Sequence, residues 1–371
     1  MAKSTTTSSG EMTIDERLKR LRLFMKVKKL DGYLLSHIPC IRYFTGFSGS
    51  NATVIVTDDD LHFFTDERYT EQIKDELHKT RGLKTYIQRD VWGYIKEEAI
   101  LKGVGTLAFE STRVSYSTAM HIRKVMKPIR LVPFKGTLDK LTIPKTKEEI
   151  ENIQKAADIV SEVYDHILNF AKEGMRENEI AAEISYQCRR RGSQGDAFEI
   201  ICVSGARGAL IHGRASDKKL QKGDLVTLDF GAVVNGFNSD MTRTFAVGKP
   251  SAEQVNAYNL VLEAEQQAIA GIKAGVKAQY IDAIARGIIE DGGYGETFKH
   301  STGHGLGIEV HESPGLSVRS KNDILPEHSV VTVEPGIYVA DKFGIRIEDD
   351  VLVTANGHQV LTSARRDLVS I

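Results

Sequence analysis

The sequence predicts an α/β domain followed by an α+β domain whose two halves are related by an internal pseudo-two-fold symmetry. In the first third of the chain, short apolar runs typical of strands alternate with helical stretches. Further on, paired helical stretches accompany two hairpins with similarly placed acidic residues. A stretch containing proline and glycine predicts a linker over 133–145. We therefore expect an amino-terminal domain over 13–132 and a second domain over 146–371, preceded by a disordered tail over 1–12.

The composition excludes several classes of partner. The 371 residues are enough for two domains, and 41% apolar with 27% charged residues is ordinary for a soluble globular protein. A formal charge of −1 provides no basic field, so we expect neither nucleic acid nor a membrane as a partner. No apolar run approaches the ~20 residues that cross a bilayer, and residues 1–11 lack the apolar segment of a secretory signal. Cys40, Cys188 and Cys202 lack metal-type spacing and indicate core thiols of a reducing compartment, so the cytoplasm is expected.

In the first domain, Thr13-Ile14-Asp15-Glu16 predicts a helix start, because Thr followed three residues later by Glu forms a capping box. Leu18, Leu21 and Met25 then share one helical face. Strands are expected at 32–36, 41–44, 52–57, 61–65, 84–88, 105–109 and 130–132. Helices are expected at 67–79, 91–102 and 115–126.

The second domain is expected to open with a long helix. Thr146 and Glu149 form a second capping box, the apolar residues after them recur on one face, and Gly174 is expected to end the helix. Further helices are expected at 177–191, 253–272 and 278–290.

The first hairpin carries two carboxylates. Alternating apolar and polar residues flank Asn235-Gly236, and this dipeptide is the strongest short-range signal of a two-residue hairpin turn. That turn would place residue 229 opposite 242, so that Asp229 and Asp240 share a face, ~7–8 Å apart at the backbone. Two carboxylates on an apolar strand pair need a compensating charge, which a multivalent cation supplies.

A second hairpin repeats this placement. Glu334 follows one β-rich run and Glu348 ends the next. A three-residue turn such as Lys342-Phe343-Gly344, in which glycine supplies a positive φ, would put both side chains on one face. Between the hairpins, glycines on both sides of His304 let the backbone approach whatever the imidazole binds.

The two hairpins and the histidine supply four carboxylates, one imidazole and no thiolate. This oxygen-rich set with a single nitrogen suits Mn²⁺, Co²⁺ or Zn²⁺. Four carboxylates would leave a net negative charge around one divalent ion, whereas two ions ~3.5–4 Å apart balance them. We therefore predict two divalent cations, Mn²⁺ before the others, with a hydroxide between them as the nucleophile. The predicted ligands are Asp229, Asp240, His304, Glu334 and Glu348.

Four stretches of the second domain resemble metallopeptidase family M24, the pita-bread fold group of methionine aminopeptidase, prolidase and aminopeptidase P. They are LDFGAVVNGFNSDMTRTF, STGHGLGIEVHE, VEPGIY and GIRIEDDVLVT. All five ligand positions of the family hold matching residue types in the family's order. The runs Tyr43–Ser50 and Thr65–Tyr69 resemble the amino-terminal domain of the aminopeptidase P-like and prolidase-like members, which methionine aminopeptidases lack. The resemblance implies a pita-bread second domain and a homodimer.

The resemblance also implies catalytic and substrate-binding roles. Glu334, besides binding metal, takes the proton of the hydroxide and delivers it to the leaving nitrogen. His212 contacts the substrate near the scissile amide, although the residues alone fit equally well a loop histidine paired with backbone. His311 stabilises the oxyanion of the tetrahedral intermediate. His300 and Tyr338 occupy positions of the substrate pocket.

Arg346 shares a strand face with Glu348, because it lies two residues before it. Its guanidinium could pair with an acidic ligand or anchor a substrate carboxylate in a bidentate fork. Asp349 and Asp350 are expected to be solvated charges at the end of the strand, although Asp349 could orient Arg346.

These residues and the resemblance predict a dimetal exopeptidase that cleaves the Xaa-Pro bond of proline-containing peptides. The Tyr43–Ser50 run favours an Xaa-Pro aminopeptidase over the alternative, an Xaa-Pro dipeptidase (prolidase). A non-catalytic pita-bread binding protein and a creatinase-like amidinohydrolase are disfavoured, because the ligand set is complete here. From the residues alone a dimetal phosphoesterase also stays open, although only Arg346 and Arg243 are evident as phosphate-binding cations.

Overall fold

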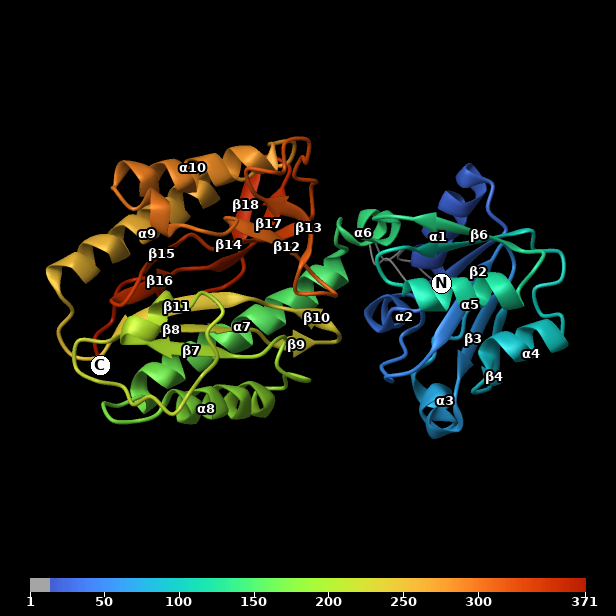
Figure 1. Ribbon diagram of the computed structural model, residues 1–371, viewed down its shortest axis with the longest axis horizontal. Coiled ribbons are helices and arrows are strands. Elements are labelled where there is room, and N and C mark those ends of the chain that lie inside the picture. Colours follow the sequence, from blue (N-terminus) through green and yellow to red (C-terminus); the bar gives the residue numbers. More distant parts are fainter. Residues whose placement is uncertain (1–13) are drawn as a thin grey trace, which may run out of the picture. The chain divides into compact units, whose positions relative to one another are not determined.

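The computed structural model describes residues 14–371, so the expected tail and Thr13 of the first capping box lie outside the described part (Figure 1). The chain divides into two compact units, one ending at Thr142 and the other spanning Ile143–Ile371. Among the described residues, no helix is both long and apolar enough to cross a membrane.

The first unit is built on a mixed six-stranded sheet with the order β4-β3-β2-β1-β5-β6. Its strands are β1 (Gly32–Leu35), β2 (Thr53–Thr57), β3 (Leu61–Thr65), β4 (Leu83–Ile87), β5 (Thr106–Glu110) and β6 (Arg130–Phe134). Its helices are α1 (Ile14–Lys28), α2 (Ile38–Thr45), the short η1 (Glu67–Tyr69), α3 (Gln72–Glu76), α4 (Val91–Glu97), α5 (Tyr116–Val125) and α6 (Thr137–Thr142). As expected, Leu18, Leu21 and Met25 of α1 are buried.

Three local expectations in this unit were wrong. The run 41–44, expected to be a strand, belongs to α2, which has Pro39 in its first turn and ends at Gly46 with a φ of 83°. The helix expected over 67–79 is interrupted and forms η1 and α3. The stretch 133–145, expected to be the linker, contains the end of β6 and all of α6.

The second unit repeats one plan, a pair of helices followed by a bent hairpin. The first half contains α7 (Lys147–Phe170), α8 (Glu177–Arg190), β7 (Ile201–Ser204), the short η2 (Gly205–Ala209), β8 (Leu225–Phe230), β9 (Val233–Val234), β10 (Phe237–Asn238) and β11 (Met241–Ala246). The second half contains α9 (Ala252–Ala270), α10 (Ala278–Asp291), η3 (Gly295–Thr297), β12 (Gly303–Leu306), β13 (Glu312–Leu316), β14 (Val330–Val333), β15 (Gly336–Val339), β16 (Phe343–Arg346), β17 (Asp349–Thr354) and β18 (Gly357–Val360).

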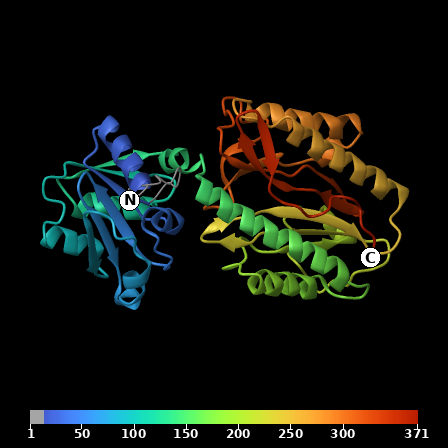
Figure 2. The ribbon, with the colours of Figure 1, turned by 180° about the vertical axis from the view of Figure 1, so that it is seen from behind.

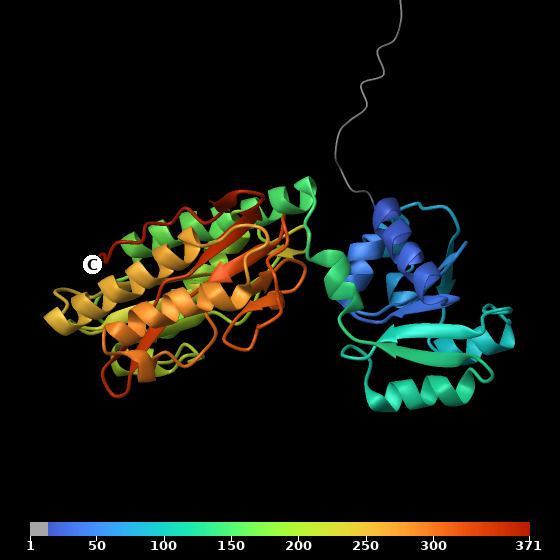
Figure 3. The same cartoon turned by 90° about the horizontal axis from the view of Figure 1, so that it is seen from above.

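Each half has its own apolar core. One core joins α7 and α8 to β7, β8 and β11, and the other joins α9 and α10 to β14 through β17. Figure 2 shows α7 crossing the face of the first half, and Figures 1 and 3 show α9 and α10 side by side over the second. The capping box of Thr146 and Glu149 is present at the start of α7, but this helix ends at Phe170, before the expected stop at Gly174.

The two hairpins set the register of the site. Asn235 and Gly236 adopt φ values of 50° and 83°, and Asp229 lies opposite Thr242, as the dipeptide predicted. The second hairpin keeps one register from the pair Val333–Asp349 to the pair Val339–Phe343, so 334 and 348 share a face as expected.

The turn of the second hairpin differs from the expected one. It consists of residues 340–342, and Asp341, with a φ of 59°, supplies the positive φ that we expected from Gly344. Gly344 is needed for a different reason, because a Cβ atom there would collide with the carbonyl oxygen of Gly208.

Candidate metal centre and active site

All five predicted metal ligands come together around one cavity of about 530 Å³ in the second unit. Asp240, Glu334 and Glu348 lie next to strand ends of the two hairpins, whereas Asp229 lies within β8 and His304 on β12. Such ends turn side chains out of the hydrogen-bonded ladder and toward a shared space. The residues are Asp229, Asp240, His304, Glu334 and Glu348.

The spacing of the ligand atoms suits a cation. Asp240, His304 and Glu348 each offer an atom within 4.8 Å of the other two. The Nε2 atom of His304 lies 3.6 Å from Oδ2 of Asp240 and 3.5 Å from Oε1 of Glu334, too far for good hydrogen bonds. The Nδ1 atom of His304 donates to the carbonyl of Gly305 at 3.0 Å, so a neutral ring presents the lone pair of Nε2 to the cavity.

Three carboxylates each have one buried oxygen without a hydrogen-bond partner in the described part of the chain. Oδ2 of Asp229 accepts from Arg346 at 2.5 Å, and Oε2 of Glu348 accepts from the Thr242 hydroxyl at 2.5 Å. Oδ1 of Asp229, Oδ1 of Asp240 and Oε1 of Glu348 are buried and unpaired. Buried polar atoms of this kind are costly unless a further partner binds them, and divalent cations fit this donor set.

The electrostatics of the site agree with this fit. Burial raises the pKa of Asp240 and of Glu348 well above the ordinary range, and the neighbouring carboxylates raise both further. Burial also raises the pKa of Glu334 to about 8, although Arg346 opposes the shift. Burial lowers the pKa of His304, which keeps its ring neutral. Ionisation of all these carboxylates together requires added positive charge, which two divalent cations would supply.

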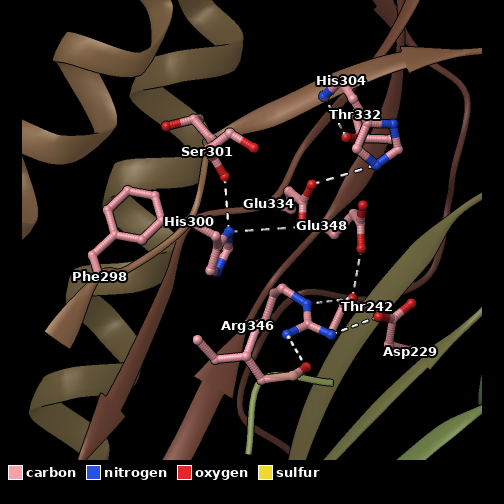
Figure 4. A network of polar contacts seen from close by, with 12 residues as sticks. Asp229, Thr242, Phe298, His300, Ser301, His304, Thr332, Glu334, Arg346 and Glu348 are labelled. Atoms are coloured by element: carbon pink, nitrogen blue, oxygen red, sulfur yellow. Dashed lines mark hydrogen bonds and ion pairs between the residues drawn. The ribbon is translucent and has the colours of Figure 1, made fainter. Parts of the chain in front are cut away.

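Arg346 takes the first of its two expected roles and pairs with an acidic ligand. Its Nη2 donates to Asp229, and its Nε donates to Thr242 at 3.0 Å (Figure 4). Through Thr242, whose hydroxyl donates to Glu348, this one guanidinium orients ligands from both hairpins. Sequence reasoning missed Thr242; its signal was its position opposite Asp229 in the predicted register.

His300 and Tyr338 extend this network. Nη1 of Arg346 donates to the hydroxyl of Tyr338 at 2.8 Å. Nδ1 of His300 lies 2.8 Å from the carbonyl of Ser301, which can only accept, so Nδ1 carries the proton. Burial, with the nearby charge of Arg346, lowers the pKa of His300 to about 3, so the ring is neutral and its Nε2 accepts from Tyr338 at 2.8 Å. Tyr338 is itself buried between the two.

The expectation for Asp349 and Asp350 was wrong, because both are fully buried. Asp349 does not contact Arg346; it accepts from Nη2 of Arg243 at 2.7 Å and pairs with Arg366. The Oδ2 atom of Asp350 accepts from the backbone N–H of Asp240 at 3.1 Å. The partners of both carboxylates come from other segments of the chain, which a strand-by-strand reading cannot show.

His212 and His311 are exposed residues that line the cavity. The ring of His311 lies 4.4 Å from the ring of His304, centroid to centroid. Burial of part of the ring, together with His304, lowers the pKa of His311. The structure thus brings nine of the ten predicted site residues to the cavity wall, and Tyr338 contacts two of them from its buried position.

Comparison with known proteins agrees with the fold. Residues 151–355 match metallopeptidase family M24, and residues 17–141 match the creatinase/prolidase N-terminal domain. An Xaa-Pro dipeptidase of Pyrococcus furiosus is 38% identical over 354 residues, which cover 95% of this chain and 99% of that protein. Among solved structures, an Xaa-Pro dipeptidase from Bacillus anthracis is 38% identical with a TM-score of 0.91, covering 97% of this chain and all of that one. An X-Pro aminopeptidase from Thermotoga maritima MSB8 is 36% identical with a TM-score of 0.90, covering 95% of this chain and 99% of that one.

These matches confirm the creatinase-type amino-terminal domain and the pita-bread fold of the second unit. They extend over nearly the full length of the chain, and they include the region that carries the five predicted ligands. The chain belongs to metallopeptidase family M24.

Proposed function

We propose that this protein is an Xaa-Pro dipeptidase that uses two divalent cations, Mn²⁺ first among them. The observation that carries the proposal is the meeting of four carboxylates and one imidazole at one cavity, where three buried carboxylate oxygens have no hydrogen-bond partner among residues 14–371. The ligands would be Asp229, Asp240, His304, Glu334 and Glu348. Their unpaired oxygens and the Nε2 lone pair of His304 are the donors that would hold the ions.

Divalent cations bound there would activate a water molecule and polarise the carbonyl of the scissile bond. Glu334 would take the proton of that water and deliver it to the nitrogen of the leaving proline. His212 and His311, both at the cavity wall, would contact the substrate near the scissile amide and stabilise the developing oxyanion. His300 would shape the slot for the proline ring and is held rigid by Tyr338.

The choice of dipeptidase corrects the preference drawn from the sequence. That preference rested on the Tyr43–Ser50 run, but the run lies in a domain described as shared by creatinases and prolidases, so it does not separate the two activities. Relatives over nearly the whole chain are named Xaa-Pro dipeptidase. An Xaa-Pro aminopeptidase stays the second candidate, because this chain is also 36% identical to the X-Pro aminopeptidase from Thermotoga maritima MSB8, with a TM-score of 0.90.

Dipeptide recognition needs a group that binds the free carboxylate next to the proline. The guanidinium of Arg346 is already committed through Nε, Nη1 and Nη2. Arg214 also lines the cavity and is exposed, and its Nε pairs with the carboxylate of the exposed Glu199 at 3.0 Å. We therefore favour Arg214 as the residue that binds the substrate carboxylate.

The test is hydrolysis of Ala-Pro and Ala-Pro-Ala by protein stripped with a chelator and then reloaded with Mn²⁺, Co²⁺ or Zn²⁺. The proposal predicts metal-restored cleavage of Ala-Pro and little cleavage of the tripeptide. Preferential cleavage of the tripeptide would replace it with the aminopeptidase, and cleavage of neither would reject both. The homodimer and the cytoplasmic location stay proposals that sedimentation and fractionation would test.

A further inference from the structure

Each half of the second unit contains a buried acidic residue on its second helix that binds a loop carrying a cavity histidine. In the first half it is Glu177, the first residue of α8, and in the second half it is Asp282 of α10. Both side chains are fully buried, and each is paired with one arginine, Arg207 or Arg286. We call each acid with its arginine an acid–arginine clamp.

The first clamp holds the loop that carries His212. Oε1 of Glu177 accepts from the backbone N–H and the hydroxyl of Ser204, both at 2.8 Å. Oε2 accepts from the backbone N–H and the hydroxyl of Ser216, at 3.1 and 2.6 Å, and from Nε of Arg207 at 3.1 Å. Nη2 of Arg207 then donates to the carbonyl of Arg214 at 2.6 Å. The loop is thus fixed at Ser204, before His212, and at Arg214 and Ser216, after it.

The second clamp holds the segment that carries His300. Oδ1 of Asp282 accepts from the backbone N–H and the hydroxyl of Thr302, at 3.2 and 2.9 Å, as Glu177 does from Ser204. Nε and Nη2 of Arg286 both donate to Asp282 at 3.0 Å. Nη2 also donates to the carbonyl of His300 at 2.8 Å, and Nη1 donates to the carbonyl of Phe298 at 3.1 Å.

The two clamps share their contacts but not their sequence layout. In each, the carboxylate binds both the N–H and the hydroxyl of one Ser or Thr, and the arginine binds both the carboxylate and a backbone carbonyl of the histidine segment. The arginine comes from η2 in the first half and from α10 itself in the second. The same geometry reached from different positions points to a shared task at the two histidines.

We propose that the acid–arginine clamps are positioning elements, Glu177–Arg207 for His212 and Asp282–Arg286 for His300. This inference rests on the proposed function for the roles of the two histidines. A buried ion pair adds little stability over an apolar replacement, so stability alone does not account for two of them. A carboxylate that collects three or more donors does fix a loop with a precision that catalysis needs, because small displacements of a reacting group cost rate steeply.

The first test follows the histidines directly and needs no substrate. Imidazole ¹H–¹⁵N resonances of His212 and His300 are recorded in Zn²⁺-loaded protein and assigned with His212→Gln and His300→Gln. Glu177→Gln is expected to shift or broaden the His212 signals and leave those of His300 in place. In either orientation of the glutamine amide, its NH₂ group faces the backbone N–H of Ser204 or of Ser216 and cannot accept a hydrogen bond from it. Asp282→Asn is expected to do the reverse.

Matched controls are available on the same helices. Glu179→Gln changes an exposed acid two residues from Glu177, and glutamine keeps the capping box of α8. Asp291→Asn changes an exposed acid at the end of α10. Both controls are expected to leave the two histidines unchanged. If Glu177→Gln does not fold, Arg207→Gln tests the same clamp at a partly exposed residue.

The second test is kinetic. Glu177→Gln and Asp282→Asn are expected to lower kcat for Ala-Pro by about 10- to 100-fold while Mn²⁺ affinity, measured by calorimetry, stays unchanged. Unshifted histidine signals in the folded variants, or a loss of kcat no larger than the loss of metal affinity, would overturn the inference. If wild-type protein cleaves no Xaa-Pro peptide, the proposed function fails, while the histidine signals still decide whether the clamps position these side chains.

Discussion

Replacing Glu334 by Gln is expected to reduce the pH dependence of the stability of the metal-free protein. In the folded state, burial raises the pKa of this carboxyl from its ordinary 4.5 to about 8. Between these values the folded protein holds a proton that the unfolded chain has released. The free energy of unfolding therefore falls as pH rises through this window.

The size of the effect follows from the shift. For one proton, the free energy of unfolding falls by about 1.4 kcal/mol per pH unit in the middle of this window and by less near its two ends. The loss from pH 5 to pH 8 is therefore about 3.5 kcal/mol. Glutamine carries no such proton. The free energy of unfolding of Glu334→Gln, relative to wild type, is therefore expected to rise by about 3.5 kcal/mol over the same range.

The assay is urea unfolding of chelator-treated wild type and Glu334→Gln at pH 5, 6, 7 and 8. Asp240 and Glu348 are present in both proteins, so the difference between the two curves reports residue 334 together with its effect on the pKa of these two neighbours. As a control, saturating Mn²⁺ is expected to stabilise the wild type more at pH 8 than at pH 5, because binding requires ionised carboxylates. A difference between wild type and variant that does not change with pH would refute the reasoning.

Three further substitutions test the network around the ligands. Arg346→Met leaves the buried Asp229 without its partner and is expected to lower the free energy of unfolding by about 3–5 kcal/mol in urea titrations; a loss below about 1 kcal/mol would mean that the pair is not needed. Tyr338→Phe removes the donor to Nε2 of His300 and is expected to cost about 1–3 kcal/mol in the same assay, whereas no cost would contradict the assigned proton positions. Arg214→Gln is expected to lower kcat/KM for Ala-Pro by about tenfold or more and to spare the amide Ala-Pro-NH₂, as expected for loss of a charge-assisted hydrogen bond; equal losses on both would argue against carboxylate binding at Arg214.

The site could be located from the sequence because its two hairpins have strong local signals. Asn235-Gly236 permits one turn, and that turn places Asp229 opposite Thr242. For the second hairpin, the sequence predicted the number of turn residues but not which residues form the turn. Aspartate can adopt the positive φ observed at Asp341, but an aspartate in the sequence does not require a turn there. The number of turn residues was sufficient to place Glu334 and Glu348 on one face.

What could not be predicted depends on contacts between distant residues. Asp349 looked like a solvated strand end because its partners, Arg243 and Arg366, are far from it in sequence or come from another strand. Most contacts of the acid–arginine clamps were invisible for the same reason, since Glu177 collects donors from Ser204 and Ser216, and Asp282 collects them from Thr302. Only the Asp282–Arg286 pair is local, with its two residues four apart on α10. The run 41–44 was misread as a strand because a short apolar run fits either element, and only its bracketing Pro39 and Gly46 favour the helix.

The central claim is that the five residues hold two divalent ions on which Xaa-Pro cleavage depends. The most direct test titrates Mn²⁺ into chelator-stripped protein while bound metal is counted by calorimetry and Ala-Pro hydrolysis is followed in parallel. We expect two Mn²⁺ per chain, activity that appears only with metal, and loss of both binding and activity in His304→Ala. Full activity in the stripped protein, or saturation at one ion per chain with full activity, would contradict it.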